Sequence, residues 1–100
     1  MHLKAFCSGA VSFEATKNAA LVHFPGIGEA RTARHRLLAW LHEKVPGSPE
    51  RISEQHFWCR SRTAPYVELG YREGSELGKA LFDSVLEALQ ENGVPHGRLV

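Results

Sequence analysis

The sequence has few cysteines, no long hydrophobic run and almost no net charge, and each of these features excludes a class of protein. Its two cysteines, Cys7 and Cys59, are too few for the disulfide framework of a small secreted domain. No apolar run approaches the roughly 20 residues that a membrane-spanning helix needs. The formal net charge of +1 gives no general attraction to nucleic acid or to acidic membranes. We therefore expect electrostatic recognition to be local and expect no membrane contact.

The remaining composition is that of an ordinary globular chain. Of the 100 residues, 43% are hydrophobic and 23% are charged. This length favours a single domain, residues 1–100, with one modest core. The N-terminal segment is too short and too polar for a signal peptide, so we expect a cytoplasmic protein with free thiols.

Two amphipathic helices are predicted from apolar residues that recur at spacings of three and four. The first begins after Gly28 and ends before Pro46. The second covers residues 75–92, with Ser75 as its N-cap and Gly93 just past its end. The first helix is net basic and the second net acidic, a difference that favours self-association; the alternative is that both charged faces are simply solvated.

Four strands are predicted around these helices. Residues 56–72 are typical of two strands joined by a turn, and Val67, Leu69 and Tyr71 alternate there with freer positions. Residues 10–16 and 20–24 fit an N-terminal hairpin, whereas residues 45–50 have the composition of a loop. Residues 37–46 resemble residues 85–95, which is what a duplicated ββα unit would produce, although amphipathic helices also resemble one another by chance.

These elements predict an α+β, two-layer sandwich. The order is ββαββα, with an antiparallel sheet of about four strands and two helices on one face. The alternative replaces the first hairpin with an N-terminal helix. Since helices on one face leave the other free, homodimerisation through the sheet is expected.

The alternative rests on residues 15–33, ATKNAALVHFPGIGEARTA. This stretch resembles the helix-hairpin-helix motif of non-sequence-specific DNA-binding proteins, with Pro25–Gly28 as the hairpin. The resemblance implies that the backbone N–H groups of Gly26, Ile27 and Gly28 bind DNA phosphate, supported by Arg31 and Arg34. The second helix departs from the family pattern at Thr32, His35 and Arg36.

The same residues predict an anion- or partner-binding site without that motif. Two glycines at a helix N-terminus allow backbone N–H groups to converge where the helix dipole is positive. Arg31, Arg34 and Arg36 add full charge there, and guanidinium groups bind phosphate or carboxylate in a bidentate manner. In the alternative interpretation, Glu29 already neutralises the helix end and the arginines only cover its polar face.

A second basic pair, Arg60 and Arg62, lies on one face of a predicted strand. Aromatic residues are nearby, namely Trp58, Tyr66 and Tyr71. Basic and aromatic side chains on an exposed sheet stack the bases of single-stranded nucleic acid. The alternative is that the aromatic residues pack beneath the helices.

Catalytic and metal-binding patterns are weak. Cys7, Cys59, His23 and His56 lack the spacing of a zinc site, so we expect no metal and no cofactor. His56 lies three residues from Cys59, which places the two side chains on opposite faces of a strand. We therefore expect no catalytic residue, with a small Cys/His-dependent enzyme as the second alternative.

Together these patterns predict a small non-catalytic interaction domain that binds a protein partner or an anionic ligand and forms a homodimer. The expected binding residues are Gly26, Ile27, Gly28, Arg31, Arg34, Arg36, Arg60 and Arg62. A nucleic-acid-binding protein that uses the hairpin and the nearby arginines is the first alternative.

Overall fold

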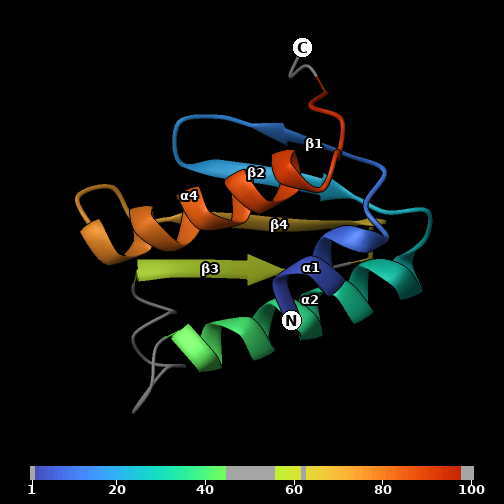
Figure 1. Cartoon of the computed structure of the whole chain (residues 1–100), viewed down its shortest axis with the longest axis horizontal. Coiled ribbons are helices and arrows are strands. Elements are labelled where there is room, and N and C mark those ends of the chain that lie inside the picture. Colours follow the sequence, from blue (N-terminus) through green and yellow to red (C-terminus); the bar gives the residue numbers. More distant parts are fainter. Residues whose placement is uncertain (1, 45–55, 62, 98–100) are drawn as a thin grey trace.

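The computed structural model of the chain describes residues 2–44, 56–61 and 63–97. The elements in chain order are α1 (His2–Ser8), β1 (Ser12–Ala15), β2 (Ala19–His23), α2 (Ile27–Lys44), β3 (Phe57–Arg60), β4 (Tyr66–Tyr71) and α4 (Glu76–Glu91). The strands form one antiparallel sheet, and the helices pack against one of its faces (Figure 1). This confirms the predicted α+β class. The loop expected at 45–50 lies outside the described residues.

The strand order in the sheet is β1-β2-β4-β3. The two hairpins therefore meet through their second strands, and Val22 lies opposite Val67 at the centre. Each hairpin is followed by a helix, α2 or α4. The order is the one that two ββα units produce when they pair through their second strands.

Strands cover Ser12–Ala15 and Ala19–His23, as the predicted N-terminal hairpin requires, so the alternative of a helix before the Pro25–Gly28 hairpin is wrong. Phe13 and Val22 are paired across β1 and β2 and point into the core, which a helix over this segment would not allow. The predicted order also lacked α1, which makes the order αββαββα. α1 has only seven residues, too few to show a helical period, and a helix of that length is stable only through packing.

The two long helices begin and end near their predicted positions. Ser75 is the N-cap of α4, and its hydroxyl oxygen accepts a hydrogen bond from the backbone N–H of Gly78 at 2.9 Å. Gly93 follows the helix with a φ of 73°, a conformation that favours glycine. α2 begins at Ile27, slightly earlier than predicted. No helix in the described part of the chain is long and apolar enough to cross a lipid bilayer.

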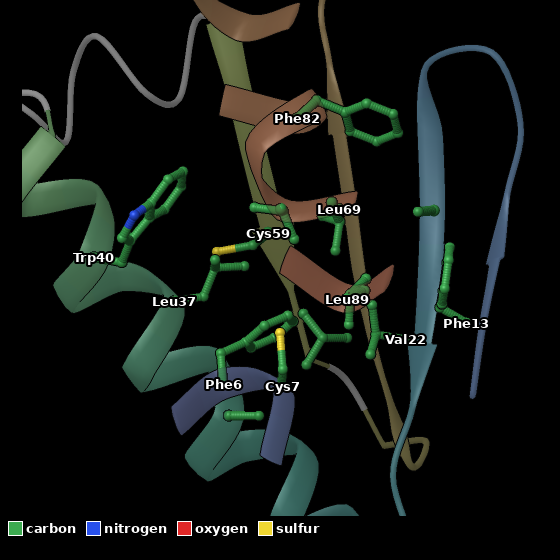
Figure 2. Packing of buried hydrophobic residues seen from close by; sticks show 14 of the residues in the cluster. Phe6, Cys7, Phe13, Val22, Leu37, Trp40, Cys59, Leu69, Phe82 and Leu89 are labelled. Carbon is green, nitrogen blue, oxygen red and sulfur yellow. The ribbon is translucent and has the colours of Figure 1, made fainter. Parts of the chain in front are cut away.

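The core lies between the helices and the sheet. Phe6 and Cys7 of α1 and Leu37 of α2 meet side chains from the sheet and from α4 there (Figure 2). α1 packs mainly on α2 and also touches α4. The side chains with less than 2% exposure include Phe6, Phe13, Val22, Leu37, Phe57, Val67, Leu69, Phe82, Val85 and Leu89. All three helices are thus held by a single apolar layer.

Both outer strands have contacts along their free edges. At the outer edge of β1, the backbone N–H of Phe13 donates to the carbonyl oxygen of Pro95. The backbone N–H of Gly97 donates to the carbonyl oxygen of Phe13. At β3, Arg34 Nε of α2 donates to the carbonyl oxygen of Cys59 at 3.3 Å. Exposed strand edges pair readily with other chains. These edges are thus partly occupied, and none of the described helices covers the other face of the sheet.

Candidate interaction surface

The entry to α2, which the sequence marks as an anion site, already carries a carboxylate. The carbonyl oxygen of Gly26 accepts the first helical hydrogen bond from Ala30 at 3.1 Å. The side chain of Glu29 folds back so closely that a Cβ atom on Gly26 would lie 2.9 Å from its Oε1. Neither Gly26 nor Gly28 has a positive φ. Neither glycine is therefore required here by a left-handed backbone, and Glu29 complements the helix dipole.

The three arginines of α2 do not converge on one point. Arg34 is half-buried and holds Cys59 of β3, whereas Arg36 Nη1 donates to the carbonyl oxygen of Ala5 in α1 at 3.2 Å. Arg31 is exposed and makes no hydrogen bond or ion pair with any described residue. Arg34 and Arg36 thus connect α2 to neighbouring elements, which explains basic residues in the early turns of this helix.

These contacts predict unequal losses of stability. We expect Arg34→Ala to lower the free energy of unfolding by about 1–2 kcal/mol, because it removes a charge-assisted hydrogen bond to a carbonyl near the core. Arg36→Ala and Arg31→Ala should each change it by less than about 0.5 kcal/mol, since both side chains are exposed. Urea denaturation of the three variants tests this order. Equal losses for Arg34→Ala and Arg31→Ala would contradict a structural role for Arg34.

Arg60 lies on the other side of the sheet from α2. It is exposed, whereas its neighbour Cys59 points into the core, as the alternation along a strand requires. Arg62 lies outside the described residues. The predicted binding residues therefore divide between the helical layer and the opposite face of the sheet.

The face of the sheet opposite the helices, here the open face, is covered by none of the described helices (Figure 1). Alternation along the four strands places there the side chains that do not enter the core. They are Ser12, Glu14, Ala19, Leu21, His23, Trp58, Arg60, Tyr66 and Glu68, with Gly70 between Ala19 and Trp58. Most are half-buried, and Arg60 is exposed. Tyr71, expected beside the other aromatic residues, is buried on the helix side at 7% exposure.

Polar and charged side chains on the open face contact each other across the strands. His23 Nε2 lies 2.9 Å from Glu14 Oε2, and Arg60 Nη1 lies 3.8 Å from Glu68 Oε1. The strand register puts Glu14, Leu21, Glu68 and Arg60 in one row across the sheet. Leu21 is thus an apolar residue between two carboxylates.

Two aromatic residues add to this surface. The indole of Trp58 lies against Gly70, where any Cβ atom would collide with it. The guanidinium carbon of Arg60 is 5.9 Å from the centre of the indole, within the range of a cation–π contact. Tyr66 packs edge-on against His23, with ring centres 5.8 Å apart. Trp58 and Arg60 form one ordered unit at the β3 edge of the open face.

A shallow hollow of about 170 Å³ lies at the other side of the open face. It is lined by Glu14, Thr16, Ala19, Ala20, Leu21 and Glu68. Small side chains and Leu21 form its apolar part, and Glu14 and Glu68 are its two carboxylates. The open face therefore carries an aromatic and basic pair on β3, with the indole lying against Gly70, and a depression over β1 and β2 that reaches Glu68 of β4.

A second hollow, of about 440 Å³, lies between the end of α1 and the first turns of α2. It is lined by Gly9, Phe24, Gly28, Glu29, Thr32, Ala33 and Arg36. The predicted residues Gly28 and Arg36 therefore share this hollow. Its two charged groups are engaged, because Arg36 binds α1 and Glu29 folds over the backbone at Gly26.

The two thiols lie within the core and not at a surface site (Figure 2). Burial raises the pKa of Cys7 to about 11. Burial also raises the pKa of Cys59 to about 11, against a smaller opposing effect of Arg34. His23 lies on the open face, and His56 Nδ1 bonds to Ser75 Oγ at 2.6 Å. Within the described ranges, no three Cys, His, Asp or Glu side chains gather as a metal site.

These thiols predict slow alkylation and a stability that depends on pH. At neutral pH we expect both to react with a thiol reagent only as fast as the protein opens, since the thiolate is the nucleophile. A raised folded-state pKa means that the folded chain binds more protons than the unfolded chain between pH 9 and 11. The thiol contribution to the free energy of unfolding should therefore fall as pH rises through this window. Rapid labelling of the folded protein at pH 7 would contradict the expectation of slow alkylation.

Part of the open face can be predicted from the alternation of residues along the strands, and not from charge alone. The residue types of Trp58, Tyr66 and Arg60 point to a surface, and alternation puts Glu68 on the freer side of its strand, whereas nothing local marks Glu14 and Leu21. Their positions in alternation with buried neighbours place them on the second face, but joining them in one row requires the register of three strand pairs.

Comparisons with known proteins give no relative from which a function could be transferred. No protein-family model, curated protein or solved structure matches the chain.

Proposed function

We propose that the chain is a non-catalytic interaction domain that binds a protein through the open face of its sheet. The observation that carries this is the face itself, where Trp58, Leu21 and Tyr66 lie among charged groups on the side away from the helices. Mixed aromatic, aliphatic and charged surfaces of this kind are typical of protein interfaces. The contacts along part of both strand edges support the face, and not an edge, as the docking surface.

The charges of the open face favour a protein over a nucleic acid. Glu14 and Glu68 would repel phosphate groups, and the described arginine of this face, Arg60, lies near Glu68. The arginines of α2 point elsewhere, with Arg34 and Arg36 bonded to backbone carbonyls. The helix-hairpin-helix interpretation loses its support, because strands stand where its first helix belongs.

The proposal of a non-catalytic role is supported by the state of the two thiols. A pKa of about 11 keeps both Cys7 and Cys59 protonated at neutral pH, and a protonated thiol is a poor nucleophile. Both cysteines are unpaired. Unpaired thiols agree with a reducing compartment, and we propose the cytoplasm as the location.

The first experiment uses the chain itself as the protein probe. We expect sedimentation velocity to show association as the concentration rises, and we expect Leu21→Lys to weaken it at least tenfold. Lysine at this position would lie between Glu14 and Glu68, so the fold should tolerate it. Gln90→Lys on the exposed side of α4 is the matched control and should associate like the original chain.

A single-stranded oligonucleotide is the second probe in the same series. Association of the chain that is sensitive to Leu21→Lys but not to Gln90→Lys supports a protein-binding face. A chain that stays monomeric, or that binds the oligonucleotide with an affinity falling steeply with salt, overturns the proposal.

A further inference from the structure

The open face is self-complementary in charge. One cross-strand row runs from Glu14 on the outer strand β1, through Leu21 and Glu68, to Arg60 on the outer strand β3. An acidic group therefore stands at one end of the row and a basic group at the other. A second copy of this face, turned so that its β1 lies over β3, brings opposite charges together at both ends.

The face is also complementary in shape. The hollow is lined by Glu14, Thr16, Ala19, Ala20, Leu21 and Glu68, so it lies over β1 and β2 and reaches β4. On the adjacent row, Ala19 is followed by Gly70 and then by Trp58. The hollow thus lies toward the β1 side of the sheet and Trp58 extends from β3 on the other side, just as Glu14 and Arg60 stand at the two ends of their own row.

A single two-fold rotation both pairs the opposite charges and brings Trp58 to the hollow. A two-fold axis that runs parallel to the strands, above the boundary between β2 and β4, places β1 of one copy over β3 of the other. Because the axis runs parallel to the strands, each cross-strand row of one copy faces the same row of the other copy. Two sheets then face each other at about 10 Å, as in a β-sandwich. The interface is isologous, so each favourable contact occurs twice.

We infer that the hollow is the binding site for Trp58 of a second copy of this chain, with Arg60 of that copy directed at Glu14. This inference rests on the proposed function and adds the identity and orientation of the partner. Trp58 is already ordered against Gly70 and beside Arg60, so little conformational freedom is lost when it docks. A large aromatic residue seated in a pocket is a common centre of binding energy.

The test is charge reversal in the full chain, read as the dimer dissociation constant by sedimentation equilibrium. Glu14→Arg and Arg60→Glu each place like charges at both ends of the row, and each should raise the constant about tenfold or more. The chain carrying both substitutions restores both pairs and should return to within about threefold of the original. Glu87→Arg, exposed on α4, is the charge-matched control and should leave the constant unchanged.

Trp58 provides a second readout, because Trp40 is buried at 5% exposure and is shielded from a quencher in either state. Acrylamide quenching should decrease as the chain associates. If the chain associates but the double variant is not restored, or quenching is unchanged, this orientation is overturned while the protein-binding function stands. If the original chain does not associate at any concentration, both are overturned.

Discussion

Replacing Gly78 with alanine is expected to destabilise the fold by about 2–4 kcal/mol, although alanine favours helices over glycine by about 1 kcal/mol. Gly78 lies in the first turn of α4, where the helix packs against the chain just before β3. An added Cβ would collide with the carbonyl group of His56 and lie 3.0 Å from the Cβ of Tyr71. The His56 carbonyl is held in place, because it accepts the backbone N–H of Arg72 at 3.0 Å. The clash therefore has to move backbone, and not a flexible side chain.

Gly28→Ala is the matched control for this prediction. Gly28 lies near the start of α2 with a negative φ, and an added Cβ would have no atom within 4 Å. Its replacement should leave the fold unchanged or stabilise it by about 0.5 kcal/mol. Chemical denaturation of both variants measures the difference. If Gly78→Ala proved as harmless as Gly28→Ala, the close contact between α4 and His56 would be refuted.

Phe6→Ala is expected to lower the free energy of unfolding by about 3–4 kcal/mol. Phe6 is fully buried, and its ring meets that of Phe24 edge-on at 5.9 Å between centres. This is a large share of the roughly 5–15 kcal/mol that a domain of this kind has in total. The prediction tests whether α1, which covers the core beside α2, is part of the cooperative fold.

Lys4→Ala, on the exposed side of the same helix, is the control and should cost less than about 0.5 kcal/mol. Thermal and urea unfolding of both variants should be monitored by circular dichroism and by Trp40 fluorescence. If Phe6→Ala unfolded α1 but left the midpoint of the main unfolding transition unchanged, α1 would not be part of the cooperative fold.

These stability predictions concern the helix side of the sheet, whereas the binding proposals concern the open face. Substitutions such as Leu21→Lys and Glu14→Arg lie on the far side from Phe6 and Gly78, in a layer that no described helix covers. We therefore expect association and folding stability to respond to different sets of residues. This separation allows loss of binding to be distinguished from loss of structure.

The sequence by itself determined the α+β class, the two long helices and their limits. Apolar spacing of three and four fixes which side of α2 and α4 is buried, and Ser75 and Gly93 supply local capping chemistry that needs no distant partner. Alternation in β4 likewise sends Val67 and Leu69 into the core. These features depend on residues within a few positions of one another, so they can be predicted from the chain alone.

The tertiary structure alone decided the N-terminal segment, the roles of the arginines and the composition of the open face. α1 is too short to show a period and forms because Phe6 and Cys7 are buried by distant elements. Arg34 donates to a carbonyl oxygen 25 positions away in the sequence. Its charge alone suggests a bound ligand, but the folded chain itself provides the hydrogen-bond acceptor. The row from Glu14 to Arg60 needs three strand registers at once. Long-range pairing, and not local propensity, sets those registers.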